Sequence, residues 1–214
     1  ASVNFAQKKM IVIPNGFAVT AKDLNLDSTS PRDVLVLGMA ARWDPQKDFA
    51  TLIEAVSICV YEKECKIKLY LAGARMDEDN QKLRALISRF KLTNSVFLMG
   101  RLDDIDTFYQ SLDVHCLISL FGEGFPNVVA ESMLNGVPNI VTNVGDSAII
   151  VDDTGWQVRP GDNSALVECI LSAASDKVSG KLKMRGSNAS QKIRDEYSLK
   201  KMVERYQNAW DSGR

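Results

Sequence analysis

The sequence predicts an α/β fold, a Rossmann-like doubly wound parallel sheet with helices on both faces. Apolar runs of strand length lie at residues 34–40, 67–73, 96–100, 114–119, 139–142 and 156–158. Most of these runs are continuously apolar, which is typical of parallel strands that are buried on both faces. Segments of helical period separate them, and this alternation of strands with helices favours a doubly wound sheet.

Two of the separating segments have the clearest helical period. Apolar residues recur three and four positions apart at Phe49, Leu52, Ile53, Val56 and Cys59, and again at Leu83, Leu86, Ile87 and Phe90. In doubly wound sheets, ligands bind beyond the carboxyl ends of the strands, near the point where the strand order reverses. We therefore expect a functional site among the loops that follow residues 40, 73, 100, 119 and 142.

Composition limits the kind of partner. The 214 residues include 26 Lys and Arg against 27 Asp and Glu, so charge gives no reason to expect nucleic acid as a partner. The four cysteines are scattered and form no pair or Cys/His cluster, so we expect reduced thiols and no metal site. No apolar run approaches the roughly 18 residues that a transmembrane helix needs.

The strongest local signal is segment 122–131, Gly-Glu-Gly-Phe-Pro-Asn-Val-Val-Ala-Glu, directly after a predicted strand. Pro126 has the fixed φ suited to the first turn of a helix, which we expect to reach about residue 135 and stop at Gly136. The start of that helix exposes unpaired N–H groups and the positive end of the helix dipole, which favours phosphate binding. Gly122 and Gly124 would let a ligand approach the backbone closely.

Two carboxylates flank this expected anion site. Glu123 lies in the loop before the helix, and Glu131 follows eight positions later with a side chain that leans back toward the helix start. Such a pair can accept hydrogen bonds from hydroxyl-rich groups on either side of a diphosphate, for which a ribose and a sugar are natural candidates. The alternative is a solvated Glu123 and a Glu131 on the helix surface.

A second polar loop, Arg42-Trp43-Asp44-Pro45-Gln46-Lys47, follows the predicted strand 34–40. Arg42 and Lys47 could neutralise a diphosphate, the arginine with a planar fork of donors and the lysine as a point charge. The alternative is a capping loop with solvated charges. Trp43 could stack on a ligand or cover the loop.

Other groups that could carry chemistry have simpler explanations. Asp104 and Asp106 resemble a metal-binding pair, but they precede an apolar helix pattern, so helix capping explains them better, as it does the acidic run 77–79. His115, the only histidine, lies inside an apolar run, which favours a packed core histidine over a catalytic base. The motifs of nicotinamide dehydrogenases and P-loop NTPases are absent.

These elements occur in an order that resembles the C-terminal domain of glycosyltransferase family 4, a group of GT-B-fold enzymes that build bacterial capsules, O-antigens and related glycans. The resemblance extends from about residue 9 to residue 210 and rests on Ile-Pro-Asn15-Gly, Ala41-Arg42 with Lys47-Asp48, Gly100-Arg101-Leu102, Glu-Gly-Phe-Pro-Asn-Val-Val-Ala-Glu, Gly136-Val137-Pro138 and Asn143-Val144-Gly145-Asp146. Members usually have Ala-Met-Ala after the second glutamate and an apolar residue after the proline. This chain has Ser132-Met133-Leu134 and Asn139 instead.

The resemblance implies a role for each candidate residue. Glu131 would bind the ribose of a donor nucleotide, and Glu123 would hold hydroxyls of the transferred sugar near its anomeric centre. Arg42 and Lys47 would hold the diphosphate and stabilise it as the leaving group. The backbone segment of Gly124, Phe125, Pro126 and Asn127 would cradle sugar and phosphate through those of its residues that carry an N–H group. The base would meet mainly main-chain atoms at Arg101 and Leu102.

The resemblance also implies a reaction and a domain plan. Such enzymes are retaining, transfer a sugar from a UDP- or GDP-sugar by front-face substitution, and need no metal or other cofactor. Residues 1–16 would be a linker remnant, 17–197 the nucleotide-sugar-binding domain, and 198–214 a helix that packs on an absent N-terminal acceptor domain. That helix would begin after Ser198 and present an apolar stripe formed by Leu199, Met202, Val203, Tyr206, Ala209 and Trp210.

This plan predicts that the chain alone binds the donor but cannot transfer it to the glycan or lipid-linked acceptor. The expected location is the cytoplasm, with contact to the inner face of the membrane only through the other domain. Two alternatives stay open. One is a nucleotide-sugar epimerase or phosphorylase that shares the fold, and the other is a ligand-free α/β interaction module.

Overall fold

The computed structural model describes residues 10–19 and 31–212, and a six-stranded parallel sheet forms its centre. The strand order is β3-β2-β1-β4-β5-β6. The strands are β1 (Val34–Ala40), β2 (Lys66–Ala72), β3 (Val96–Gly100), β4 (Val114–Leu117), β5 (Asn139–Thr142) and β6 (Trp156–Val158). The predicted fold class is therefore confirmed, and all six strand segments are found within two residues of their expected bounds.

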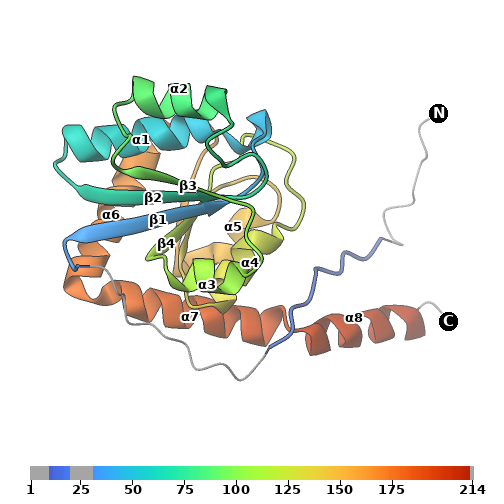
Figure 1. Cartoon of the computed structure of the whole chain (residues 1–214). Coiled ribbons are helices and arrows are strands. Elements are labelled where there is room, and N and C mark those ends of the chain that lie inside the picture. The colour runs from blue at the N-terminus through green and yellow to red at the C-terminus, as the bar shows by residue number, and fades with distance from the viewer. Residues whose placement is uncertain (1–9, 20–30, 213–214) are drawn as a thin grey trace.

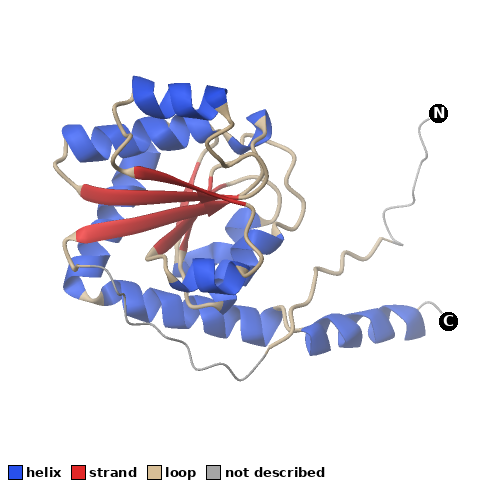
Figure 2. Ribbon diagram, in the orientation of Figure 1, coloured by secondary structure: helices blue, strands red, loops and turns tan. Residues whose placement is uncertain are grey.

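Helices cover both faces of this sheet (Figures 1 and 2). One face carries α1 (Phe49–Tyr61), α2 (Gln81–Arg89) and α6 (Asn163–Ser179). The other face carries α3 (Ile105–Gln110), α4 (Asn127–Leu134) and α7 (Lys181–Glu196). The short helix α5 (Ser147–Val151) follows β5, and α8 (Leu199–Asp211) continues outward from the end of α7.

The apolar pattern did not predict α6 and α7, and the packing of α7 explains why for that helix. Its buried face consists largely of small residues, among them Gly186, Ala189 and Ser190. A Cβ at Gly186 would lie 2.1 Å from the carbonyl oxygen of Gly136, at the end of α4. Because α7 approaches α4 this closely, its contact face cannot carry the large apolar side chains that mark a helix in a sequence.

The strand order reverses between β1 and β4, and this arrangement brings two loops together. β1 pairs with β2 along its whole length and with β4 through Leu37 and Gly38. The loops that follow β1 and β4 are therefore neighbours, and the N–H of Leu120 donates a hydrogen bond to the carbonyl oxygen of Gln46 at 2.8 Å. Ligands of doubly wound sheets bind at such a reversal.

Beneath these loops, three buried polar side chains form one network. His115 on β4 has no exposed area, as expected of a core histidine, and its Nε2 accepts the N–H of Ala40 at 3.1 Å. Its Nδ1 therefore carries the hydrogen and donates to the Oδ1 of Asn139 at 2.7 Å. The Nδ2 of Asn139 donates to the Oγ of Ser132 at 2.9 Å. Ser132 and Asn139, which are among the positions where the chain departs from the pattern of the family that it resembles, are thus hydrogen-bonded to each other.

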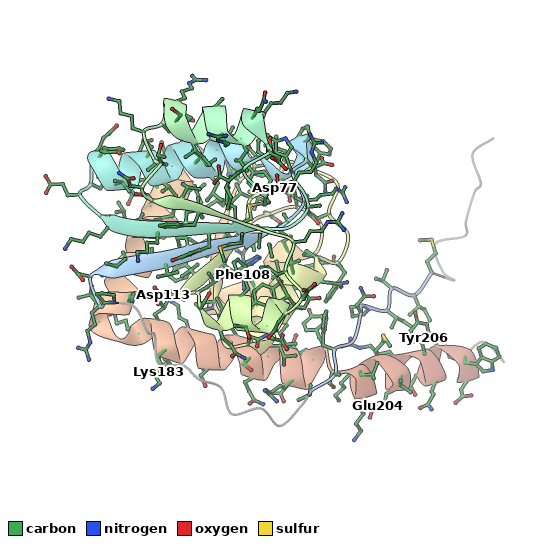
Figure 3. The ribbon with its side chains drawn as sticks, in the orientation of Figure 1. Asp77, Phe108, Asp113, Lys183, Glu204 and Tyr206 are labelled. Atoms are coloured by element: carbon green, nitrogen blue, oxygen red, sulfur yellow. The ribbon has the colours of Figure 1, made fainter. Side chains whose placement is uncertain are left out.

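The N-terminal segment and α8 lie together beside the end of α7 (Figure 1). Phe17 bridges to Ser198, the N-cap of α8, and a Cβ at Gly16 would lie 2.7 Å from the Cβ of Met202. No residue of α8 is buried, and its predicted apolar stripe is largely exposed, with Tyr206 projecting from the helix (Figure 3). Residues 1–9 of the predicted linker, and residues 20–30 of the predicted donor domain, lie outside the described residues.

Within the described parts of the chain, the structure contains no helix with the length and apolar character that a membrane span requires.

Candidate functional site

The loops after β1 and β4 join through the carboxylate of Glu123. Lys47 forms an ion pair with its Oε1, Ser119 Oγ donates to the same atom at 2.5 Å, and Gln46 Nε2 donates to it at 3.3 Å. The side chains of Lys47 and Glu123 are only 13% and 10% exposed. The alternative that these two charges are solvated is therefore wrong. Among the described residues, the second oxygen of this carboxylate, Oε2, accepts no hydrogen bond.

Two helix caps hold Lys47 in place. The short 3-10 turn Pro45–Lys47 begins at Asp44, whose Oδ1 accepts the N–H of Gln46 at 3.0 Å. Asp48 follows Lys47 in the left-handed conformation, with φ 45°, and caps α1 by accepting the N–H of Thr51 at 3.3 Å. A loop that is capped at both ends has little freedom, so the ammonium of Lys47 has a defined direction.

Arg42 pairs with Asp44, and no described contact joins it to Glu123. Its Nε pairs with the Oδ2 of Asp44 at 3.2 Å, and its side chain is 64% exposed. A backbone hydrogen bond from Gln46 lowers the pKa of Asp44 most, and the hydrogen bond from Arg42 lowers it further. For Arg42, therefore, the alternative of a solvated charge describes the structure, although Arg42 lies only five positions before Lys47.

Glu131 is held from a different element. It lies on α4, half-buried, and its Oε2 accepts a hydrogen bond from the hydroxyl of Tyr109 on α3 at 3.1 Å. Burial raises the pKa of the Glu131 carboxyl, the hydrogen bond from Tyr109 lowers it, and the nearby charge of Asp106 raises it. The Oε1 of Glu131 accepts no hydrogen bond among the described residues. Each of the two carboxylates therefore has one oxygen fixed by the protein and the other available.

The backbone between these carboxylates has free donors. Among the described residues, the N–H groups of Gly124, Phe125 and Asn127 make no hydrogen bond, whereas the carbonyl of Gly124 accepts the N–H of Asp146 at 3.0 Å. The helix begins at Asn127, and Pro126 is its N-cap with ψ 97°, so the expectation that Pro126 belongs to the first turn was one residue early. The helix ends as predicted, and Gly136 has a positive φ of 78°.

A close backbone contact keeps this loop in place. A Cβ at Gly145, which has φ 56°, would lie 2.3 Å from the carbonyl oxygen of Glu123 and 2.6 Å from that of Gly124. The loop after β5 can therefore approach only because residue 145 lacks a side chain. The segment Asn143-Val144-Gly145-Asp146, which the resemblance includes, thus packs directly against the backbone of Glu123 and Gly124.

Aromatic packing ties the same loop to the N-terminal segment and to the end of α7. The ring of Phe125 lies 6.0 Å from that of Phe17 and 5.4 Å from that of Tyr197. Beside them, the Nδ2 of Asn15 donates to the Oδ1 of Asn127 at 2.8 Å. Residues from both ends of the described chain thus help to fix the conformation of the loop.

The loop after β3 borders the site less tightly. Arg101 is exposed, and Leu102 is half-buried against the small apolar cluster beneath α3. Gly100 has φ 65°, and its backbone is fixed by a donated bond to Met76 and an accepted bond from Gly73, both 2.7 Å. No described contact joins Arg101 or Leu102 to Glu123 or Glu131, so their place in the site stays a prediction.

The acidic residues and the tryptophan outside the main motif have structural roles. Asp104 caps α3 by accepting the N–H of Thr107 at 3.1 Å, as predicted. Helix α2 is capped by Asn80, not by the acidic run 77–79, because the amide oxygen of Asn80 accepts the N–H of Leu83 at 3.1 Å. Trp43 covers its loop, with its ring 5.3 Å from that of Phe49. The described residues include no group of three His, Cys, Asp or Glu suited to hold a metal ion.

Sequence reasoning missed three residues of the site. Ser119 and Gln46 bind Glu123, and Tyr109 binds Glu131. Ser119 and Gln46 lie in loops at the carboxyl ends of β4 and β1, where ligand-binding polar residues are expected, so they could have been found. Tyr109 gave no signal, because an aromatic residue on a helix face more often indicates core packing.

One known protein family matches most of this chain. The family model described as Glycosyl transferases group 1 matches residues 32–176. The chain is 24% identical over 212 residues to UDP-Gal:alpha-D-GlcNAc-diphosphoundecaprenol alpha-1,3-galactosyltransferase of Escherichia coli, covering 94% of this chain and 54% of that protein. It is 26% identical over 186 residues to the O-antigen biosynthesis glycosyltransferase WclY of Escherichia coli, covering 85% and 48%. The chain therefore spans about half the length of these relatives.

Solved structures give the same picture of the fold. HepE of Anabaena in complex with UDP superposes with a TM-score of 0.78 at 25% identity, covering 94% of this chain and 57% of that one. A glycosyltransferase from Rickettsia africae superposes with a TM-score of 0.82 at 21% identity, covering 96% and 57%. The second likeness is one of fold alone.

Proposed function

This chain belongs to the group 1 glycosyl transferases, and from that membership we propose that it binds a nucleotide diphosphate sugar as the donor-binding, C-terminal half of a family 4 enzyme. The observation that carries the proposal is the shared arrangement of Glu123 and Glu131. Each carboxylate has one oxygen bound by protein donors and one oxygen without a described donor. Such oxygens suit hydroxyl groups of a ligand between them.

The free N–H groups support a diphosphate between the two carboxylates. Gly124, Phe125 and Asn127 offer donors that no described residue occupies, at the start of α4, where the helix dipole favours negative charge. Lys47 adds a positive charge next to Glu123. In this proposal Glu123 holds the sugar, Lys47 the diphosphate and Glu131 the ribose.

Arg42 completes the diphosphate site by changing partner. Its exposed pair with Asp44 contributes little stability, since ion pairs in solvent are worth about 0–1 kcal/mol. The diphosphate of the donor, with one negative charge on each phosphate, is a stronger partner for the guanidinium and can be bound in a bidentate way. We therefore expect Arg42 to leave Asp44 when the donor binds, and Arg101 and Leu102 to meet the base through their backbone.

The proposed reaction is retaining transfer with the diphosphate as the leaving group. Lys47 and Arg42 would stabilise the negative charge that develops on the phosphate as the glycosidic bond breaks. These two cations supply the role that a divalent metal has in other sugar transfers, so the proposal includes transfer without a metal or other cofactor. Undiminished activity of the whole enzyme in excess EDTA would agree with this part, and loss of activity would reject it.

The proposed domain plan rests on the exposed apolar surface of α8 and the N-terminal segment. Met10, Ile11 and Val12 are each more than 60% exposed, and Trp210 is 72% exposed. Exposed patches of this kind mark protein interfaces. Residues 1–16 would be the linker and 198–214 the helix that packs on an N-terminal acceptor domain, with 17–197 as the donor domain.

The biological setting follows from the relatives and is part of the same proposal. The name of one Escherichia coli relative specifies transfer to a diphosphoundecaprenol-linked sugar, and the name of the other specifies O-antigen biosynthesis. We propose a comparable acceptor, a glycan or lipid-linked sugar, and action in the cytoplasm at the inner face of the membrane. We favour a UDP-sugar over a GDP-sugar as the donor, because the name of the galactosyltransferase specifies UDP and HepE was solved in complex with UDP.

A thermal-shift panel of nucleotides and nucleotide sugars tests the proposal. A ligand that binds only the folded state raises its melting temperature, by an amount that grows with concentration. We expect UDP and one UDP-sugar to raise it, and CMP-linked sugars not to. The epimerase or phosphorylase alternative instead predicts that the whole enzyme converts or phosphorolyses its sugar substrate without a glycan or lipid-linked acceptor. No shift with any nucleotide would favour the ligand-free interaction module.

A further inference from the structure

Tyr109 is a fully buried residue that reaches Glu131 from a neighbouring helix. It lies on α3 with no exposed area, and its hydroxyl donates to the Oε2 of Glu131 at 3.1 Å, across 22 positions of sequence. A buried hydroxyl without a partner is costly, so the two groups hold each other in place. None of the roles described above uses Tyr109.

The ring of Tyr109 is fixed by the core beneath it. It meets the ring of His115 edge to face, with centroids 5.5 Å apart and an interplanar angle of 88°. His115 is itself fixed, because its two ring nitrogens bond to the N–H of Ala40 and to the Oδ1 of Asn139. Burial lowers the pKa of His115 to about 4, so this bonding pattern persists at neutral pH.

This anchoring determines the direction of a carboxylate that would otherwise rotate. Glu131 is half-buried on α4, and among the described residues Tyr109 is its only side-chain partner. With Oε2 held by a rigid donor, Oε1 lies in one direction relative to the helix. An acceptor that is oriented before the ligand arrives binds more tightly than one that must be ordered on binding.

We propose that Tyr109 is a positioning residue for the nucleoside, which orients Glu131 so that its free oxygen accepts the ribose hydroxyls of the donor. The inference rests on the proposed function, since it takes Glu131 as the ribose contact. It adds a residue that belongs to no motif of the chain and lies on a helix outside the two site loops.

The test compares two ligands that differ only in the ribose. UDP and 2′,3′-dideoxy-UDP are titrated by calorimetry into the wild-type chain and into Tyr109→Phe. Tyr109→Phe keeps the ring and removes the hydroxyl, so the core stays filled. We expect the variant to bind UDP up to about tenfold more weakly, because the carboxylate of Glu131 must then be ordered when the ribose binds. Its affinity for the dideoxy nucleotide should change by less than about twofold.

Two controls separate positioning from a general structural role. Tyr61→Phe removes a hydroxyl that donates to the carbonyl of Lys91 at 2.6 Å, at the end of α1, and should change neither affinity. In the background Glu131→Gln, adding Tyr109→Phe should cause no further loss of UDP affinity, because the carboxylate that it orients is gone.

The outcomes are distinct. Equal losses for both nucleotides in Tyr109→Phe would mean a purely structural role and would overturn the inference, as would no loss for either. A further loss in the Glu131→Gln background would overturn it as well. Failure of the wild-type chain to bind either UDP or GDP would instead reject the proposed function, and the inference with it.

Discussion

Lys47 and Glu123 form an ion pair that joins two loops separated by 76 positions of sequence. The pair is nearly buried, with Ser119 and Gln46 bound to the same carboxylate oxygen. A buried pair of this kind adds little stability by itself, because both charges lose their hydration. The pair instead orients both groups. One oxygen of the Glu123 carboxylate and the remaining N–H hydrogens of the Lys47 ammonium stay available beside the start of α4.

Removal of the ammonium should weaken nucleotide binding. In Lys47→Met the apolar stem remains and the charge is lost, so we expect the affinity for UDP to fall by about 10- to 100-fold, the range of one hydrogen bond between charged groups. Calorimetric titration measures this. Lys66→Met is the matched control, since Lys66 pairs with Asp33 on the exposed surface, and it should change the affinity by less than about twofold. Equal affinities for wild type and Lys47→Met would remove Lys47 from the diphosphate site.

Glu123→Gln should distinguish the sugar from the nucleotide. Glu123 is assigned to the sugar hydroxyls, so the variant should lose affinity for the preferred UDP-sugar by about tenfold and keep its affinity for UDP within about threefold. The comparison needs only the two ligands and one protein preparation. A loss of the same size for both ligands would place Glu123 at the phosphates instead.

On acidification, the affinity for UDP should begin to fall (the acid limb of its pH dependence) at a higher pH than if Glu131 had the pKa of an ordinary glutamate. Burial raises the pKa of Glu131, so its carboxylate becomes protonated at a higher pH than usual as the solution is acidified, and it then accepts ribose hydroxyls less well. Asp106 raises this pKa further through its charge. We therefore expect Asp106→Asn to move the acid limb of UDP affinity to lower pH, measured between about pH 4 and about pH 8. An unchanged limb in Asp106→Asn would contradict the assignment of this limb to Glu131.

The buried pair of Ser132 and Asn139 should behave as one unit in unfolding. Asn139→Leu leaves the Nδ1–H of His115 without its acceptor, and we expect it to lower the free energy of unfolding by about 2–4 kcal/mol. Urea denaturation measures this. Adding Ser132→Ala to that variant should cost less than Ser132→Ala costs in the wild type, because the shared bond is already gone. Strictly additive losses would show that the two residues act independently.

The exposed face of α8 should contribute little to the stability of this chain. Val203 is 44% exposed and Ile193 on α7 has no exposed area. Val203→Asp should therefore shift the melting temperature by less than about 2 °C, whereas Ile193→Asp should prevent stable folding, because it places an unpaired charge in the core. A large destabilisation by Val203→Asp would mean that α8 belongs to this domain and is not free to pack on another.

Much of the fold could be predicted because both faces of the sheet are covered. Strands such as Val34–Ala40 are continuously apolar for that reason, and α1 shows its period because large side chains fill its buried face. Helix α7 escaped prediction because Gly186 and Ser190 pack it closely against α4. Asn139 could be recognised as unusual, but its partners could not, since His115 and Ser132 meet it only through strand pairing and packing.

The residues of the candidate site could be proposed from the sequence, but the contacts among them could not. The motif after β4 indicated Glu123 and Glu131 as candidates, and the loop after β1 indicated Lys47. That Lys47 pairs with Glu123, while Arg42 pairs with Asp44, depends on the distance between two loops, which no sequence spacing encodes. Tyr109 reaches Glu131 for a similar reason, because α3 and α4 lie side by side.

Calorimetric titration of the chain with UDP and with GDP is the decisive measurement for a donor-binding domain. We predict saturable one-to-one binding of at least one of them, weakened at least tenfold by Glu131→Gln and by Lys47→Met, and not by Lys66→Met. Absence of binding by either nucleotide at millimolar concentration, with the chain folded, would contradict donor binding.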